Sequence, residues 1–490
     1  MKIEQIYTGC LAEACYYIVS EGEAVIIDPL RDIQPYLDRL EKDGVVLKYI
    51  FETHFHADFV SGHLELARAT DATIVIGPTT TKTGYPCHIA FDNELFLFGK
   101  SSIKLIHTPG HTLESSCLLL IDENQLEKGI ITGDTLFIGD VGRPDLAQHV
   151  MTELTQDKLA RLLYHSLRDK ILPLPDHLIV YPNHGAGSAC GKNMSKETTD
   201  TLGNQKKVNY ALNLNLTEDD FVQEVLEGLM PPPSYFPKNV LLNIKGYESL
   251  YSVINRSHKE IDILEFEEII KDPAILLLDV RDADQFAKGF IPKSINIGLN
   301  GNFAQWVGEL IPDIQQKIIL ITENENQPLE AIVRLSRIGF DQTIGYLKEG
   351  FKIWEKSNRF FHTIKRITAT ELTNVLSEKS VVIDVRRVNE YNSQHIKRSI
   401  NIPLHTLELR LNEISNKYPF YIHCAGGYRS MMAASMLYKN GITNFIEIED
   451  GFNAIKRAVY HYLITIFKAV CFKNFIRVKV CNYYHYLLKK

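Results

Sequence analysis

The segment ETHFHADFVSGH, residues 52–63, is the most informative stretch for the fold of the first half of the chain. His54, His56 and Asp58 follow the H-x-H-x-D spacing of a metal site, in which imidazole and carboxylate groups bind an ion together. Position 59 is Phe, where a two-metal site would carry another histidine. A phenyl ring donates no lone pair, so the segment predicts a metal site that lacks one of the ligands of a two-metal site.

Short apolar runs alternate with helical patterns on both sides of this segment. Four runs closed by Gly, Pro or Asp predict buried strands: EAVIIDP, ATIVIGP, SSIKLIHTPGH and KGIITGD. Polar residues just past strand ends carry the chemistry of α/β proteins, which draws attention to His54, His111 and Asp134. The prolines of LMPPPSYFP, residues 229–237, exclude a helix and a central strand there and predict a domain boundary.

Composition limits the possible classes of protein. The chain has 490 residues, more than the ~100 to 200 of a typical domain, so we expect several globular domains. A formal charge of −7 argues against nucleic acid as a partner, because such binding needs Lys and Arg to neutralise phosphates. The N-terminal residues lack the pattern of a signal peptide, so we expect a cytoplasmic protein acting on small molecules.

The second half contains an internal repeat. LLLDVRDADQFAKGFIPKSINIGL (residues 276–299) and VVIDVRRVNEYNSQHIKRSINIPL (residues 381–404) share D-V-R, an aromatic residue five positions after the Arg, and S-I-N-I in one register. GYLKEGF (residues 345–351) later corresponds to IEIEDGF (residues 446–452). Two copies of this length predict paired α/β domains, since solenoids need about three or more shorter repeats.

Three further fragments accompany the opening segment: HTPGHT with His107 and His111, TGDTLF with Asp134, and YPNHGAGSACGKNMS with His184. In order and spacing, the fragments resemble the metallo-β-lactamase superfamily over the whole first half. The resemblance implies an αββα sandwich. It also implies, for hydrolytic members, two metals that share an aspartate. Phe59 favours one metal, although Asp58 and His184 could still hold a second.

Two imidazoles and one carboxylate with open positions form the facial triad of non-haem Fe(II) oxygenases, where substrate and dioxygen bind side by side. The persulfide dioxygenase branch of the superfamily resembles this sequence in THFHAD, HTPGHT, GD and GRPD. The resemblance assigns the iron to His54, His111 and Asp134. Three other residues would orient the ligands through hydrogen bonds or serve as alternative ligands: His56, Asp58 and His184.

Two more features adjoin this predicted centre. Arg143 and Asp145 of GRPD predict either a loop that steadies the site or meets an anionic substrate, or a surface turn with a local ion pair. Cys190 follows His184 in a Gly-rich loop that we expect near the mouth of the metal pocket. Its thiol could relay sulfur, or it could be a small buried residue of a tight loop.

YIHCAGGYRSMMAASML, residues 421–437, predicts a strand that ends in Cys424, a glycine loop with Arg429, and a helix beginning near Ser430. Backbone N–H groups of such a loop and the helix N-terminus favour a negative charge on the sulfur. C-x-x-G-x-R-S after D-V-R and S-I-N-I-P resembles the active loop of rhodanese sulfurtransferases. The resemblance implies that Cys424 carries sulfane sulfur and that Arg429 closes the loop and holds thiosulfate or sulfite.

The first copy of the repeat reads LITENENQPLEAI at the matching place. Counting back from the shared G-F sequence places Glu323 opposite Cys424. A carboxylate cannot carry sulfane sulfur and repels a sulfur anion. This domain is therefore predicted to be inactive in transfer and either to pack the other two domains or to shape an interface.

Four segments are predicted: a metallo-β-lactamase-fold domain, residues 1–240; an inactive rhodanese-like α/β domain, 255–360; an active rhodanese domain, 363–457; and a basic, aromatic tail, 458–490. The tail contains no acidic residue, and its apolar runs are shorter than the ~20 residues of a membrane span. It predicts surface association with a membrane or partner, or an unstructured extension.

Apart from the tail, the chain resembles fusion proteins in which a persulfide dioxygenase precedes an inactive and an active rhodanese domain. The resemblance implies one Fe(II) per chain, with Zn as the alternative, and oxidation of a small thiol persulfide by O2 to sulfite. Sulfane sulfur on Cys424 would convert sulfite to thiosulfate. The alternatives are a zinc thioester hydrolase of the glyoxalase II type and a non-enzymatic sensor of reactive sulfur. We expect a homo-oligomer.

Overall fold

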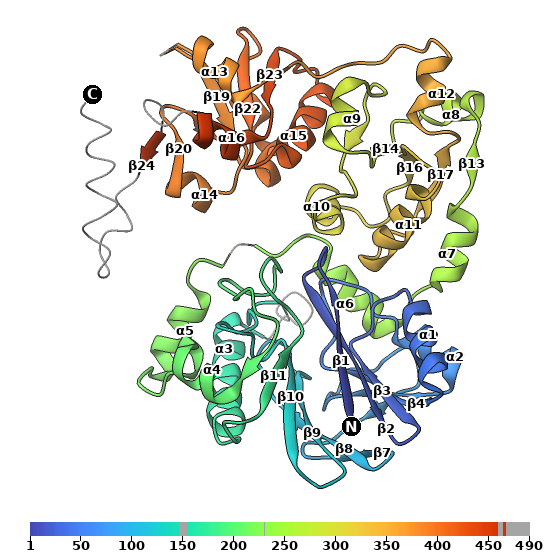
Figure 1. Cartoon of the computed structure of the whole chain (residues 1–490), viewed down its shortest axis with the longest axis vertical. Helices are drawn as coiled ribbons and strands as arrows, with labels where there is room; N and C mark the ends of the chain where they lie inside the picture. The colour runs from blue at the N-terminus through green and yellow to red at the C-terminus, as the bar shows by residue number, and fades with distance from the viewer. Residues whose placement is uncertain (147–153, 230, 378, 459–463, 467–490) are drawn as a thin grey trace. The chain divides into compact units, whose positions relative to one another are not determined.

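The computed structural model describes residues 1–146, 154–229, 231–377, 379–458 and 464–466. The chain divides into two compact units (Figure 1). The first unit contains residues 1–257, 304–315 and 332–342, and the second contains residues 258–303, 316–331 and 343–490.

Two six-stranded sheets form the centre of the first unit. The first sheet has the order β1-β2-β3-β4-β5-β6, with β1 (Lys2–Thr8), β2 (Glu13–Ser20), β3 (Glu23–Ile27), β4 (Val46–Glu52), β5 (Thr73–Ile76) and β6 (His88–Ile89). The second has the order β12-β11-β10-β9-β8-β7, with β7 (Leu95–Phe98), β8 (Ser101–His107), β9 (Ser116–Ile121), β10 (Glu127–Gly133), β11 (Ile179–Pro182) and β12 (Asp200–Thr201). The four strands expected from the apolar runs are β3, β5, β8 and β10.

Apolar side chains of both sheets pack against each other, among them Ile18, Phe51, Phe98, Leu105 and Leu120. Helices cover the outer face of each sheet (Figure 1). On the first sheet lie α1 (Gln34–Asp43), α2 (His63–Thr70) and α6 (Phe236–Lys245). On the second lie α3 (Gln156–His165), a π-helix (Ser166–Ile171), α4 (Leu202–Val208) and α5 (Glu218–Leu226). This is the predicted αββα sandwich, which is confirmed.

A buried ion pair ties a later part of the chain to the sandwich of the first unit. The Arg31 guanidinium is fully buried and donates to both carboxylate oxygens of Asp341, at 2.7 and 2.9 Å. Arg337, at the end of α11 (Gln327–Arg337), pairs with Asp32 at 2.7 and 2.8 Å. Separating residues 332–342 from the sandwich would leave the buried Arg31 charge without its partner, which is costly in free energy. These ion pairs therefore hold residues 332–342 within the first unit.

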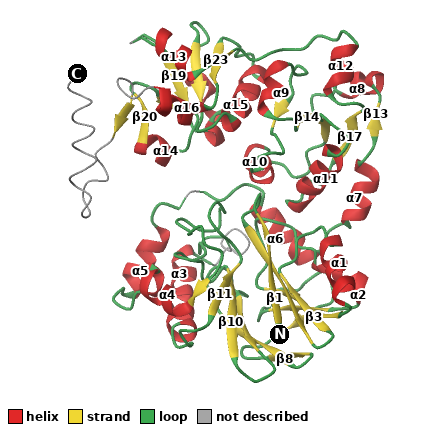
Figure 2. Cartoon of the chain, in the orientation of Figure 1, coloured by secondary structure: helices red, strands yellow, loops and turns green. Residues whose placement is uncertain are grey.

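Two parallel sheets of the same topology form the second unit (Figure 2). The first has the order β13-β17-β16-β14-β15, with β13 (Glu260–Ile261), β14 (Leu276–Asp279), β15 (Ile295–Asn296), β16 (Ile318–Ile321) and β17 (Thr343–Leu347). The second has the order β18-β23-β22-β19-β21, with β18 (Arg366–Ile367), β19 (Val381–Asp384), β21 (Ile400–Asn401), β22 (Phe420–His423) and β23 (Phe445–Ile448). The predicted pair of rhodanese-like α/β domains is confirmed.

Helices accompany each of these sheets: α8 (Ile263–Ile269), α9 (Ala283–Lys288) and α12 (Phe351–Lys356) for the first, and α13 (Ala369–Val375), α14 (Val388–Ser393), α15 (Tyr428–Lys439) and α16 (Gly451–Ala458) for the second. The D-V-R sequences have one structural role in both copies. Arg281 donates to Asp279 at the end of β14, and Arg386 donates to Asp384 at the end of β19. The repeat in sequence is therefore a repeat in structure.

The structure corrects the residue expected opposite Cys424. In the first copy Asp279 pairs with Ile321, as Asp384 pairs with His423 in the second, so Thr322 corresponds to Cys424. The loop that follows Thr322 is one residue longer than the loop after Cys424, because α11 begins at Gln327 and α15 at Tyr428. Counting back from G-F therefore gave Glu323, which is wrong by one residue. A threonine hydroxyl cannot carry sulfane sulfur either.

In the part of the chain that the structure describes, every helix is too short or too polar to cross a membrane. The predicted tail lies outside the described residues, apart from Ala458 and β24 (Ile464–Ile466), which pairs with β20 (Gln394–Ile396). Its surface association stays a prediction.

Candidate metal centre and sulfur-transfer loop

Three buried side chains meet where strands of the two sheets end. His54 follows β4, His111 follows β8, and Asp134 follows β10, and their ligand atoms lie within 4.8 Å of one another. Nε2 of His111 and Nε2 of His54 lie 3.4 and 3.9 Å from Oδ2 of Asp134. Among the described residues, no group hydrogen-bonds to either oxygen of Asp134. A buried carboxylate without donors and facing two imidazoles fits a metal ion.

Hydrogen bonds on the far side of both imidazoles direct Nε2 toward Asp134. Nδ1 of His111 lies 2.8 Å from the carbonyl oxygen of Arg143, which only accepts, so Nδ1 carries the proton. The Thr53 hydroxyl donates its proton to the Asp28 carboxylate at 2.9 Å. It therefore accepts a hydrogen bond from Nδ1 of His54 at 3.0 Å. Burial, followed by the neighbouring imidazoles, lowers the pKa of His54 well below its usual value. His54 is therefore neutral, the form that binds metals.

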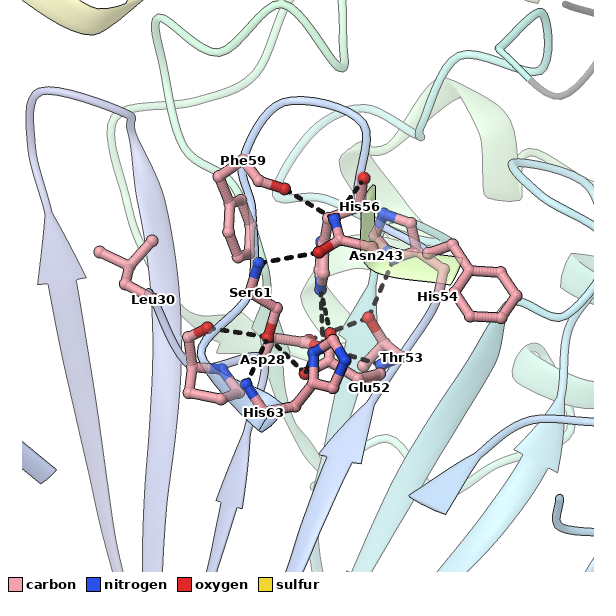
Figure 3. A network of polar contacts seen from close by, with 12 residues as sticks. Asp28, Leu30, Glu52, Thr53, His54, His56, Phe59, Ser61, His63 and Asn243 are labelled. Carbon is pink, nitrogen blue, oxygen red and sulfur yellow. Dashed lines mark hydrogen bonds and ion pairs between the residues drawn. The ribbon is translucent and has the colours of Figure 1, made fainter. Parts of the chain in front are cut away.

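His56 belongs to a network that contains the buried carboxylates of Asp28 and Glu52 (Figure 3). Its Nε2 lies 2.9 Å from Oδ1 of Asp28 and 3.4 Å from Oε2 of Glu52. Burial opposes a charge on His56, but Asp28 and then Glu52 outweigh it and raise the pKa of His56 to about 10. Phe59 stacks on the His56 ring, with centroids 4.2 Å apart. Nδ1 of His56 has no hydrogen-bond partner among the described residues, and it could bind a metal ion that displaces its proton.

Asn243 of α6 holds the loop that carries the H-x-H-x-D segment (Figure 3). Its Nδ2 donates to the carbonyl oxygens of His56 and Phe59, both at 2.8 Å, and its Oδ1 accepts from the Ser61 amide at 2.9 Å. The Ser61 hydroxyl donates to Glu52 at 2.6 Å. No sequence motif marks Asn243, because its role depends on contacts with a loop far away in the chain. Glu52 belongs to the opening segment, but only the structure shows its contacts with Ser61 and His56.

A second group of potential ligands consists of Asp58, His184 and Cys190, whose ligand atoms also lie within 4.8 Å of one another. Nε2 of His184 lies 3.4 Å from Oδ2 of Asp58 and 3.6 Å from Oδ1 of Asp134. Cys190 is 1% exposed and is therefore buried, which agrees with the second of the two expectations for this residue. Burial, with the nearby carboxylates, raises the pKa of the Cys190 thiol well above its usual value. This group could hold a second cation.

The GRPD loop contacts two of the predicted metal ligands, His111 and Asp134. Arg143 forms a two-pronged ion pair with Asp145, at 2.6 and 2.7 Å, and both side chains are buried. The ion pair is thus local but not on the surface. A Cβ at Gly142 would lie 2.0 Å from the carbonyl oxygen of Asp134, so only glycine permits this approach. Together with the bond from His111 to the Arg143 carbonyl, these contacts indicate a loop that steadies the ligands.

His107, the first histidine of HTPGHT, belongs to none of the groups of potential ligands among the described residues. Its Nε2 donates to the carbonyl oxygen of Leu113 at 2.7 Å. The spacing of the motif alone does not distinguish His107 from His111.

Cys424 lies between β22 and α15 in the second unit and is 1% exposed. The Gly427 amide donates to its sulfur at 3.2 Å, and the Ser430 hydroxyl lies 3.5 Å from the sulfur. The helix begins at Tyr428, two residues before the expected start. Gly451 has a φ of +52°, and a Cβ there would lie 2.4 Å from the Cys424 carbonyl oxygen. One backbone amide and one hydroxyl group of the loop therefore face the sulfur, where the sequence predicts several backbone N–H groups.

Arg429 pairs with Glu390 of α14, at 2.6 and 2.8 Å. This pair closes the loop against a neighbouring helix. A direct contact of Arg429 with thiosulfate or sulfite stays a prediction.

Comparison with known proteins gives the family. Residues 8–184 match the metallo-beta-lactamase superfamily, and residues 262–357 and 368–458 match the rhodanese-like domain. A crystal structure of a metallo-beta-lactamase from Staphylococcus aureus subsp. aureus COL has 30% sequence identity and a TM-score of 0.62, covering 71% of this chain and 98% of that one. The chain belongs to the metallo-beta-lactamase superfamily. Its metallo-beta-lactamase domain precedes tandem rhodanese-like domains.

Relatives of the metallo-beta-lactamase domain divide between two activities. Human mitochondrial persulfide dioxygenase ETHE1 is 30% identical over 199 residues, which are 40% of this chain and 73% of that protein. The hydroxyacylglutathione hydrolase of Tolumonas auensis is 31% identical over 172 residues, 34% of this chain and 60% of that enzyme. The chain spans less than two thirds of that hydrolase. This chain therefore combines a metalloenzyme domain with rhodanese sulfurtransferase domains. The superfamily of the metalloenzyme domain includes both hydrolases and dioxygenases.

Proposed function

We propose that the metallo-beta-lactamase domain oxidises a small thiol persulfide with O2 to sulfite at one Fe(II), and that Cys424 transfers sulfane sulfur to sulfite to give thiosulfate. The observation that carries this proposal is the Phe59 ring, stacked on His56 where a two-metal site needs a ligand. Bound iron would supply open positions at which a persulfide sulfur and dioxygen meet. The expected partners are these small molecules and other copies of the chain, without nucleic acid.

The residues of the chain have separate tasks in this scheme. His54 and His111 would hold the ion through Nε2, together with the Asp134 carboxylate, whose oxygens accept from no donor among the described residues. The Cys424 thiolate attacks the outer sulfur of RS–SH, so that a Cys424 S–S bond forms and RS⁻ leaves and takes up a proton. Sulfite then attacks the outer sulfur of the Cys424 persulfide, and thiosulfate leaves with regeneration of the thiolate.

Metal content and oxygen uptake, measured on one sample of purified protein, test the dioxygenase. We expect about one iron per chain, because Phe59 removes a ligand of the second ion, and oxygen uptake that depends on a thiol persulfide. A panel of glutathione, coenzyme A and other thiol persulfides would identify the carrier thiol. Two zincs per chain and no oxygen uptake would reject the proposal.

The second candidate function is zinc-dependent thioester hydrolysis. The group of Asp58, His184 and Cys190 favours it, because these residues could hold a second ion beside the first. A metal-bound hydroxide would then be the nucleophile. Rapid cleavage of a glutathione thioester by the two-zinc protein would support this function.

Cys190→Ser separates these readings. If Cys190 relays sulfur, the variant keeps one iron and its oxygen uptake, and thiosulfate formation falls several-fold. If Cys190 holds a second metal, the variant loses one of two ions, since a serine hydroxyl is a weak ligand for zinc. Unchanged thiosulfate formation with unchanged metal content would remove Cys190 from both roles. Metal analysis and product analysis by chromatography measure the two effects.

A further inference from the structure

A carboxyl group lies buried in the active rhodanese domain without a place in the expected mechanism. Glu447 is in β23, and its side chain is fully buried. Its Oε1 lies 2.6 Å from the Ser430 hydroxyl, and its Oε2 accepts from Nε of Arg366 at 2.8 Å. Burying a carboxyl group is costly unless it is paired, so its position close to the active loop calls for a physical role.

The Ser430 hydroxyl links Glu447 to the reactive sulfur. It lies 3.5 Å from Sγ of Cys424, 3.0 Å from the carbonyl oxygen of Gly427 and 2.6 Å from Glu447. A hydroxyl group has one proton to donate. If Glu447 is ionised, the carboxylate attracts that proton. If Glu447 is neutral, its own proton goes to the Ser430 oxygen, and the Ser430 proton is available to a sulfur anion, to which hydrogen bonds are stronger than to a neutral carbonyl.

We propose that neutral Glu447 is a positioning residue for sulfur transfer, which directs the Ser430 proton to the sulfur of Cys424. This inference rests on the proposed transfer of sulfane sulfur by Cys424. The Ser430 proton stabilises the Cys424 thiolate when it attacks a persulfide and again when sulfite releases it as leaving group. Glu447 itself touches no substrate and keeps its proton throughout.

The surroundings of Glu447 support a change of protonation within the physiological range. Burial raises the pKa of Glu447 to about 7, with a smaller contribution from Glu449, while Arg366 and the Ser430 hydrogen bond act in the opposite direction. Arg366 also donates to Asp284 of α9 at 2.6 Å. It therefore keeps a carboxylate partner when Glu447 is replaced by a neutral residue.

Glu447→Gln in the full-length chain tests the proposal, because the glutamine amide donates to Ser430 at every pH. Sulfur transfer from a thiol persulfide to sulfite is measured from pH 6 to 8.5, and the variant rate is divided by the wild-type rate at each pH. This ratio cancels the ionisation of sulfite. We expect a ratio near one at pH 6 and a rise of roughly tenfold by pH 8.5, the effect of one hydrogen bond to a charged atom. A constant ratio overturns the proposal.

Two further variants separate positioning from a direct charge effect. In a Ser430→Ala chain, adding Glu447→Gln should leave the rate unchanged at every pH, because the link is absent. A persistent rise would assign the effect to charge repulsion and contradict the proposal. If Glu447→Gln does not fold, Ser430→Ala alone should rise from about a tenth of the wild-type rate at pH 6 to about equality at pH 8.5. Exposed Glu408→Gln is the matched control, with a ratio near one throughout.

Alkylation of Cys424 by iodoacetamide, followed by peptide mass spectrometry, needs neither persulfide nor sulfite. The alkylation rate of Glu447→Gln, divided by that of the wild type, is expected to show the same rise from pH 6 to 8.5. If the wild-type chain transfers no sulfur but its alkylation shows the rise, the proposed function fails and the role of Glu447 stands. If transfer is rapid and neither ratio depends on pH, the role of Glu447 fails alone.

Discussion

Cys424→Ser is expected to abolish enzymatic thiosulfate formation and to leave persulfide-dependent oxygen uptake intact. A serine hydroxyl cannot carry sulfane sulfur, although it fits the loop in which Gly427 and Ser430 surround the sulfur. Loss of a catalytic nucleophile lowers the rate by on the order of 10³-fold or more. Sulfite should replace thiosulfate as the product of persulfide oxidation, which ion chromatography measures against the uncatalysed reaction of persulfide with sulfite.

Cys87→Ser is the matched control for this prediction. Cys87 is a free, partly buried cysteine of the metallo-beta-lactamase domain and belongs to no group of potential metal ligands among the described residues. Its variant should give the wild-type ratio of thiosulfate to sulfite. An unchanged ratio in Cys424→Ser would assign sulfur transfer to another residue, and Cys190 would be the next to test.

The sequence predicts those parts of the site that lie within single motifs. His54, His111 and Asp134 follow strand ends, and strand ends are recognisable from apolar runs closed by Gly, Pro or Asp, so their convergence follows from the αββα fold. Cys424 is recognisable in the same way from its strand, loop and helix. These predictions need only local patterns and the known order of the fold.

Features that depend on contacts between distant segments are not predictable from one sequence. Asn243 holds the metal loop from a helix, and it lies 187 residues from His56 in the chain. The buried Arg31 is explained by contacts with distant residues, among them Asp341. Thr322, and not Glu323, corresponds to Cys424 in the structure. The loop of the first copy has one extra residue, and this residue shifts a correspondence that is counted back from the G-F sequence. The sequence around Glu447 indicates only a strand, and the role of its carboxyl group depends on the hydrogen bond with Ser430 that the structure shows.

His111→Gln should abolish metal binding and persulfide-dependent oxygen uptake together. The glutamine amide can still donate to the Arg143 carbonyl, but the variant loses the Nε2 lone pair that faces Asp134 at 3.4 Å. Loss of a residue that orients a ligand already costs about 10- to 100-fold in metal affinity, so loss of a ligand should exceed about 100-fold. Iron analysis and an oxygen electrode measure the two effects, and the rhodanese activity of Cys424, assayed with thiosulfate, should persist.

His107→Gln, in the same HTPGHT motif, is the matched control, because its Nε2 donates to the Leu113 carbonyl and a glutamine amide can replace that bond. This variant should keep its iron and its oxygen uptake. Loss of iron from both variants would indicate that the motif acts through folding of the loop. Full iron content in His111→Gln would instead point to ligation through Nδ1 of His56, the buried nitrogen without a hydrogen-bond partner among the described residues. The two substitutions thus decide which histidine of HTPGHT holds the ion.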